Sequence, residues 1–334
     1  MVTTLDDFSS FDIETQPGGS KRVYYLEVAE LTSGDILRLA ALVAKGAEPG
    51  PTLVALGGVH GDEYEGPHAV RLVFNTLDPE QMAGTFVGVP QCNVPAFAAG
   101  TRTSPIDGLN LARIFPGDAQ GTITERIAYN LGEHVIARCD FLIDLHSSGT
   151  STSIAPLIGY YRSASERGRR SLDAAMAFGM PVLWGHPEVG SGRTISYAHE
   201  REIPWLYTES VGGGWLNQTH AQMYATGVTN VLKLLGVLEG EPDRQPHTHH
   251  LVGDGNNDVT AHTTLASGYF VSQLNVLDRV KKGDLIGRVV GLAGELKNEI
   301  VAQNNGVIVL LRANPTVAAG DSICVVTGEI DLQT

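Results

Sequence analysis

His60 and Glu63 lie three residues apart in a glycine-rich turn that follows the apolar run 54–56. A histidine and a glutamate at this spacing can both reach one metal ion. The H-x-x-E pattern alone is common and rarely marks a metal site. Its position favours a site here, because ligands of α/β sheets bind at the carboxyl ends of the strands.

His146 follows a second apolar run, residues 141–143, and is preceded by Asp144. Two strand ends can converge, so His60, Glu63 and His146 would form a set of two histidines and one glutamate. Such a set leaves a fourth position for water, as catalytic zinc sites require. The alternative is that His146 is a hydrogen-bonded core histidine. Asp144 is expected to be a hydrogen-bond partner or a turn residue rather than a ligand.

Glu209 and two arginines could supply the remaining groups of a hydrolytic site. Glu209 ends a third apolar run, and hydrolysis needs a base that accepts a proton from water. Arg102 and Arg113 lie in the long polar segment 93–117, and guanidinium groups match carboxylates and developing oxyanions. The alternatives are a solvated glutamate at a strand end and ordinary surface arginines.

The composition excludes several classes of protein. With 23 basic and 37 acidic residues, the formal net charge is -14, which opposes binding to nucleic acid. No run approaches the ~18 apolar residues of a membrane span, and the first residues lack the pattern of a signal peptide. We therefore expect a cytoplasmic protein with neither membrane nor nucleic-acid partners. Three separated cysteines predict neither a disulfide framework nor a thiolate metal site.

The periodicity of apolar residues predicts an α/β fold over the first ~240 residues. We expect strands at 23–28, 36–43, 52–57, 85–89, 141–145, 154–159 and 205–209. We expect helices at 64–77, 122–139, 165–178 and 220–235. The runs 54–56 and 141–143 are continuously apolar, which predicts two central strands.

A change of composition divides the chain near residue 245. The segment 239–246 carries two prolines and several charges, as a linker does, and His247, His249 and His250 would belong to it. The following residues form short apolar runs separated by glycine and asparagine, which predicts a small all-β domain. We therefore expect a hydrolase domain at 1–245 and a β domain at 246–334.

Four ordered motifs resemble the succinylglutamate desuccinylase/aspartoacylase family, relatives of the zinc carboxypeptidases. They are residues 58–63, 102–117, 144–146 and 208–209, and the resemblance spans most of residues 20–334. Residues 100–108 look especially like the branch that contains the N-acetyl-diaminobutyrate deacetylases. The resemblance implies a zinc-carboxypeptidase-like mixed sheet flanked by helices, followed by a small C-terminal all-β domain.

The resemblance also implies a zinc-dependent amidohydrolase that cleaves the linear amide of an N-acylated amino acid. One Zn²⁺ per chain would bind His60, Glu63 and His146, and Glu209 would be the general base. Arg102 falls where the family polarises the scissile carbonyl. The residues expected to bind the substrate are Arg113, Arg193 and Asn110.

One departure from the family pattern concerns the substrate. The family usually has Asn before the arginine of this motif, whereas this chain has Ala112 before Arg113. The runner-up functions are a zinc carboxypeptidase and an esterase. A third reading is a non-catalytic carrier or binding protein, because the tail faintly resembles biotinyl or lipoyl domains, although the usual Met-Lys-Met tip is absent around Lys297. The oligomeric state is left open, with a homo-oligomer as one option.

Overall fold

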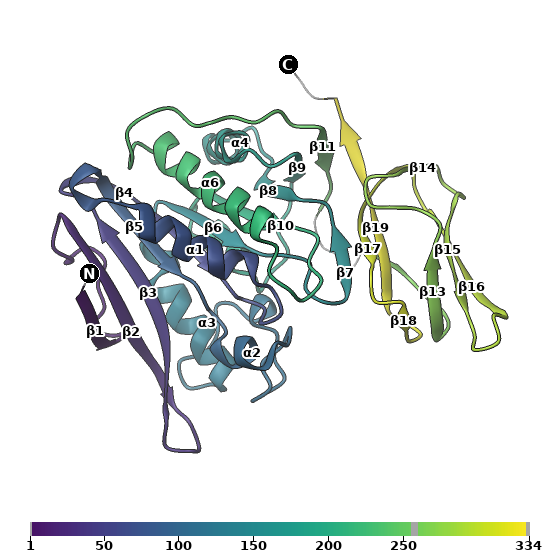
Figure 1. Ribbon diagram of the computed structural model, residues 1–334, viewed down its shortest axis with the longest axis horizontal. Helices are drawn as coiled ribbons and strands as arrows, with labels where there is room; N and C mark the ends of the chain where they lie inside the picture. Colours follow the sequence, from purple (N-terminus) through teal and green to yellow (C-terminus); the bar gives the residue numbers. More distant parts are fainter. Residues whose placement is uncertain (1, 255–259, 332–334) are drawn as a thin grey trace.

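A long mixed β-sheet runs through the protein in this computed structural model, which describes residues 2–254 and 260–331 (Figure 1). Its strands lie in the order β1 (Val2–Asp7), β2 (Ser20–Glu30), β3 (Ile36–Lys45), β5 (Ala83–Val89), β4 (Glu48–Gly57), β6 (Phe141–Leu145), β10 (Trp205–Glu209), β8 (Leu157–Tyr161), β9 (Val182–His186), β11 (His249–Val252), β19 (Ser322–Ile330), β17 (Gly306–Arg312) and β14 (Arg279–Val280). The first nine of these strands belong to the predicted α/β part.

The centre of the sheet consists of three parallel strands, β4, β6 and β10. Residues 53–56 and 142–143 are fully buried, because helices cover both faces of these strands. The prediction that these two apolar runs are central is confirmed. Parallel pairing also brings the carboxyl ends of all three strands to the same edge.

Helices cover the two faces of the sheet and form two separate cores. On one face lie α1 (Glu65–Thr76), α4 (Glu166–Phe178) and α6 (Gln218–Leu234). On the other lie α3 (Ile123–His134) and α5 (Thr194–Glu200). Along β4, Leu53 and Ala55 face the first core, whereas Val54 and Leu56 face the second, as the alternation of side chains along a strand requires.

The capping of α3 shows why the sequence predicts its start better than its end. Thr122 and Glu125 form a capping box, which fixes the first turn. The predicted helix 122–139 was wrong at its end, because α3 stops at His134 and a 3₁₀ turn, η3 (Ile136–Arg138), follows. A 3₁₀ turn continues the apolar pattern of a helix, so periodicity alone extends the helix too far.

The predicted strand 154–159 was also wrong, since two short strands replace it. They are β7 (Thr152–Ile154) and β8 (Leu157–Tyr161), and Pro156 lies between them. Proline has no backbone N–H to donate and interrupts a ladder of hydrogen bonds. Strand β7 turns away and pairs with β17 from the end of the chain. Short elements missed by the sequence analysis are β1, β9, α2 (Val94–Ala99) and α5.

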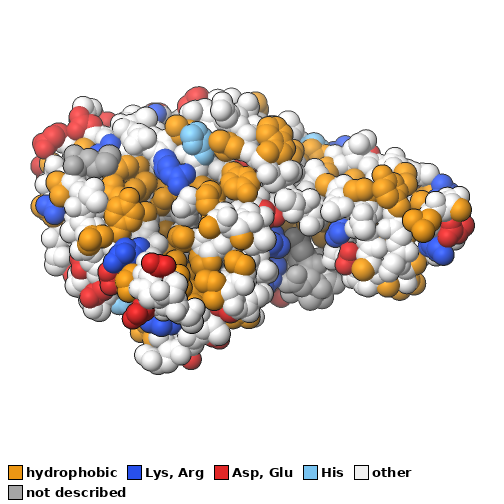
Figure 2. All heavy atoms as spheres, turned by 60° about the horizontal axis from the view of Figure 1, so that its bottom comes forward, with side chains coloured by type: hydrophobic (Ala, Val, Ile, Leu, Met, Phe, Trp, Pro, Cys, Tyr) orange, Lys and Arg blue, Asp and Glu red, His pale blue; other side chains and the backbone are white. Residues whose placement is uncertain are grey.

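The C-terminal part is a small β unit, as predicted. Its second sheet has the order β16 (Leu296–Val301), β15 (Leu285–Val290), β13 (Gly268–Ser272) and β18 (Thr316–Val317), and β12 (His262–Thr263) pairs with β19. The two sheets enclose a core that includes Phe270, Ile286, Ile308 and Ile323. This unit forms a narrower lobe beside the larger α/β part (Figure 2).

The long sheet continues across the predicted domain boundary. Strand β11 lies between β9 of the α/β part and β19 of the C-terminal part. The solvated-linker interpretation was wrong for His249 and His250, which belong to β11, and His247 is also partly buried. His247 Nδ1 donates to the Met180 carbonyl at 2.8 Å, and His250 Nε2 lies 2.7 Å from the Tyr160 hydroxyl. The boundary between residues 245 and 246 stays a prediction.

Two further sequence expectations can be compared with the structure. Cys92, Cys139 and Cys324 are all buried free thiols, which agrees with the expected absence of a disulfide framework. None of the helices in the described ranges is both long enough and apolar enough to span a bilayer.

Candidate active site

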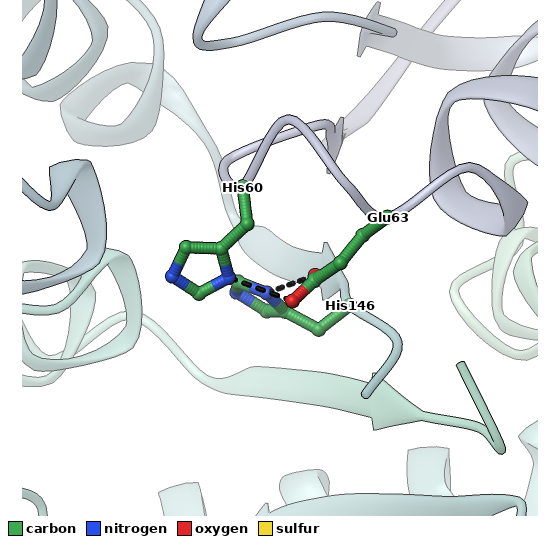
Figure 3. Close-up of side chains that lie close together, drawn as sticks. All are labelled: His60, Glu63 and His146. Atoms are coloured by element: carbon green, nitrogen blue, oxygen red, sulfur yellow. Dashed lines mark hydrogen bonds and ion pairs between the residues drawn. The ribbon is translucent and has the colours of Figure 1, made fainter. Parts of the chain in front are cut away.

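Three side chains from two neighbouring strand ends converge at the edge of the sheet. His60 and Glu63 lie in the turn between β4 and α1, and His146 follows β6 directly. Gly57 and Leu145 are partners in the parallel pairing of these strands, so the two following segments start side by side. One ligand atom from each of the three residues lies within 4.8 Å of the other two. The side chains point toward one another (Figure 3).

A hydrogen bond to Asn110 determines which ring nitrogen of His60 carries the hydrogen. Asn110 Oδ1 accepts a hydrogen bond from the Ala112 backbone N–H at 3.0 Å, so this atom is the amide oxygen. His60 Nε2 lies 3.1 Å from the same oxygen and must carry the hydrogen. Burial lowers the pKa of His60, which favours the neutral ring. The lone pair of His60 Nδ1 then faces Glu63 Oε1 at 2.8 Å.

His146 lies between two carboxylates. Its Nε2 lies 3.0 Å from Asp144 Oδ2, and its Nδ1 lies 2.9 Å from Glu63 Oε2. Burial lowers the pKa of His146, but the carboxylates of Asp144 and Glu63 outweigh burial and hold this pKa well above its usual value. The space between His146 Nδ1 and Glu63 therefore favours a positive charge. As expected, Asp144 is a hydrogen-bond partner of a candidate ligand.

The cluster formed by His60, Glu63 and His146 has the chemistry of a cation site. Burial raises the pKa of Glu63, but the two histidines outweigh this effect and hold the pKa well below its usual value, so Glu63 is ionised. A carboxylate that faces two imidazole Nδ1 atoms can share with them either a proton or a bound cation. Two imidazoles and one carboxylate suit zinc, and the hydrogen bonds of both Nε2 atoms resemble those of metal-bound histidines. The residues present therefore fit a metal ion.

Glu209 lies beside this cluster at the end of β10. Thr208 is the partner of Leu145 in the pairing of β10 with β6, which places Glu209 near His146. Glu209 Oε2 is buried without a hydrogen-bond partner in the described part of the chain. Burial, followed by the charge of Glu63, raises the pKa of Glu209 to about 8. A carboxyl group with a buried oxygen beside the metal cluster is suited to proton transfer.

One pocket contains most of the residues that the sequence analysis selected. Its lining includes His60, Arg102, Ala112, Arg113, His146, Arg193 and Glu209. Arg102 is about half exposed, and its Nη1 lies 3.4 Å from Glu63 Oε1. Arg113 lies in the 3₁₀ turn η2 (Leu111–Arg113), and Arg193 precedes α5. The side-chain oxygen of Asn110 contacts His60 and the Ala112 N–H, so Asn110 also positions a candidate metal ligand.

The sequence analysis missed an aromatic wall of this pocket. His186 Nδ1 donates to the Gly253 carbonyl at 2.8 Å, and its Nε2 accepts from the Tyr207 hydroxyl at 2.8 Å. Burial lowers the pKa of His186 to about 4, so the ring is neutral. A Cβ atom at residue 159 would lie 1.9 Å from the Tyr207 ring, so Gly159 leaves the room that the ring needs. Tyr207 could have been found, because it is two residues before Glu209 and shares its face of the strand.

Comparison with known proteins establishes the family. The model of the succinylglutamate desuccinylase/aspartoacylase catalytic domain matches residues 49–235. The chain belongs to the succinylglutamate desuccinylase/aspartoacylase family. This assignment confirms the resemblance seen in the four motifs and makes the chain a member of an enzyme family of deacylases.

Individual relatives agree with the family assignment. The chain is 34% identical over 289 residues to an N-alpha-acetyl-L-2,4-diaminobutyric acid deacetylase of Halomonas elongata, which covers 84% of this chain and 83% of the relative. It superimposes with a TM-score of 0.86 on a crystal structure of a succinylglutamate desuccinylase/aspartoacylase from Rhodobacter sphaeroides. The TM-score is also 0.86 for product-bound EutE (DoeB), an ectoine utilization protein from Ruegeria pomeroyi. Both structures are 28% identical to this chain, and each match covers 96% of this chain and 98% of the other. The predicted fold class is confirmed.

Proposed function

We propose that this family member is a zinc-dependent amidohydrolase that removes the acyl group from an N-acylated amino acid. The observation that carries the proposal is the convergence of His60, Glu63 and His146 beside Glu209, whose Oε2 is buried. The named activity of the Halomonas elongata relative supports an N-acyl amino acid as substrate.

Different residues would bind the metal, transfer the proton and stabilise the oxyanion during hydrolysis. His60, Glu63 and His146 would hold the zinc ion, which supplies a Lewis acid that polarises the acyl oxygen and lowers the pKa of water to ~7. Glu209 would accept the proton of the attacking water and later donate it to the leaving amine. Arg102, which lies next to Glu63, would donate hydrogen bonds to the developing oxyanion.

The substrate carboxylate would bind on the arginine side of the pocket. Arg113 and Arg193 both line it, and a guanidinium group binds a carboxylate through two parallel hydrogen bonds. Asn110 would hold the turn that presents Arg113, besides its contact with His60. A small-molecule substrate, a cytoplasmic location and a homo-oligomeric state stay predictions.

A substrate panel tests the proposed function against its alternatives. The zinc-loaded protein is assayed with N-acetyl, N-succinyl and N-formyl amino acids, including N-α-acetyl-2,4-diaminobutyrate, and with matched esters and C-terminal peptides. We expect a short N-acyl amino acid to have the highest kcat/KM. Preference for peptides or esters would favour a carboxypeptidase or an esterase. No turnover of any compound would favour a carrier or binding protein.

Ala112 leads to a prediction about how the substrate carboxylate binds. If the carboxylate lies at Arg113, Ala112→Asn should add a hydrogen bond to a charged group, which contributes about 1.5 to 3 kcal/mol, roughly a tenfold to hundredfold gain in affinity. The Michaelis constant for the N-acyl amino acid should fall, and that for its carboxamide analogue should not. Kinetics on this acid and amide pair measure the difference.

The variant Arg113→Ala distinguishes two explanations for the alanine at position 112. If Ala112 instead makes room for a bulkier or uncharged group, Ala112→Asn should impair the true substrate, and Arg113→Ala should matter little. Equal effects of Ala112→Asn on the acid and on the amide would rule out a carboxylate bound at Arg113.

A further inference from the structure

Thr194 shares a carboxylate oxygen with a candidate metal ligand. Its hydroxyl donates a hydrogen bond to Asp144 Oδ2, and the same oxygen accepts the Nε2–H of His146 at 3.0 Å. Thr194 and Asp144 are 50 residues apart in the chain, and their exposed fractions are only 1% and 2%. A row of three side chains, buried Thr194 and Asp144 and partly buried His146, therefore leads from α5 to the metal centre.

The two donors to Asp144 Oδ2 determine how this carboxylate is oriented. Asp144 Oδ1 is buried and has no hydrogen-bond partner within residues 2–254 and 260–331. The hydrogen bonds from Thr194 and His146 therefore restrain the carboxylate at one oxygen. Without the Thr194 hydroxyl, Asp144 would retain only its bond to His146, and its carboxylate could rotate about that contact.

We propose that Thr194 is a positioning residue for the metal centre, which acts through Asp144 on His146. This inference rests on the proposed function, in which His146 Nδ1 binds zinc. The bond from Nε2–H to Asp144 keeps the hydrogen on Nε2 and the lone pair on Nδ1, and it makes the imidazole a stronger ligand. Thr194 keeps Asp144 in the orientation that makes this bond.

The position of Thr194 links substrate binding to metal binding. It is the first residue of α5, and it directly follows Arg193, a predicted substrate-binding residue. Both residues line the pocket. A single helix start therefore presents an arginine to the pocket and fixes the orientation of a metal ligand.

The test measures zinc affinity by competition with a chelator. Thr194→Val removes the hydroxyl and retains the shape. Loss of a direct partner of a metal ligand typically lowers metal affinity ~10- to 100-fold, and we expect a loss toward the lower end of this range because Thr194 contacts the partner and not the ligand. Thr194→Ser keeps the hydroxyl and should bind zinc nearly as the wild type does. Thr194→Ala, which also lacks the hydroxyl, repeats the test if the valine variant does not fold.

Thr124→Val is the matched control for loss of a buried threonine hydroxyl. Thr124 is fully buried near the start of α3, and its hydroxyl donates to Asp107 Oδ1 at 2.8 Å, away from His146. This variant should keep the zinc affinity of the wild type. An equal loss of zinc affinity in Thr124→Val and Thr194→Val would overturn the inference, because loss of any buried threonine hydroxyl would then have the same effect.

A double-mutant cycle with Asp144→Ala, which removes the shared acceptor, tests whether Thr194 acts through Asp144. If it does, Thr194→Val should lower zinc affinity in the wild type and have little further effect in Asp144→Ala. If the two substitutions instead lower zinc affinity by independent factors that multiply in the double variant, the inference is wrong. If the wild type binds zinc and Thr194→Val binds it equally well, only this inference is wrong. If the wild type binds no zinc, the proposed function is wrong as well.

Discussion

Glu209→Gln should bind zinc like the wild type and hydrolyse the N-acyl substrate at least ~100-fold more slowly. Glutamine has nearly the shape of glutamate but cannot accept the proton of the attacking water. Glu209 is not one of the three residues whose ligand atoms converge, so its replacement should leave the metal in place. Metal analysis and kcat, measured on the same preparation, test both parts of the prediction.

Glu188→Gln is a suitable control for this experiment. Glu188 is another carboxylate at the same pocket, but it is exposed, and we assign it no part in proton transfer. The control should lose far less activity than Glu209→Gln. Near-normal turnover by Glu209→Gln would place the base elsewhere.

The alanine variants of His60, Glu63 and His146 should each lose both zinc and activity. Every one of these residues contributes a ligand atom to the cluster, and removal of one leaves only two protein ligands for a metal that needs three. Zinc content per chain after dialysis, together with kcat/KM, measures the loss.

Asp62→Asn provides the control for the alanine variants. Asp62 is a buried carboxylate next to Glu63, but its Oδ2 accepts hydrogen bonds from the N–H and hydroxyl of Thr150 instead of facing the histidines. This variant should therefore keep its zinc. Retention of one zinc per chain by all three alanine variants would show that the metal assignment is wrong.

The three residues of the metal cluster could be predicted from the sequence because each follows a recognisable strand. Strands β4 and β6 contain the continuously apolar, buried runs 54–56 and 141–143, so the polar residues His60 and His146 stand out beyond the strand ends. The parallel arrangement of α/β sheets then places such ends at one edge. Glu209 follows from the same argument, since β10 is the third parallel strand.

Thr194 and His186 could not be predicted as parts of the site, because their places depend on short elements and on tertiary contacts. Helix α5 has only seven residues, which is too short for a reliable helical period. Strand β9 has five residues, and it carries His186 into the pocket. The contact between Thr194 and Asp144 joins residues from different elements, and no pattern in either segment indicates it.

The pairing of β7 with β17 determines when the segment beside the metal centre can fold during synthesis. Strand β7 begins six residues after His146, and Leu310 to Arg312 of β17 are its partners. Ser151 also accepts backbone hydrogen bonds from Ala313 and Asn314. A ribosome delivers the N-terminal residues first. The segment next to the metal centre must therefore wait, without its partner strand, until β17 has been made.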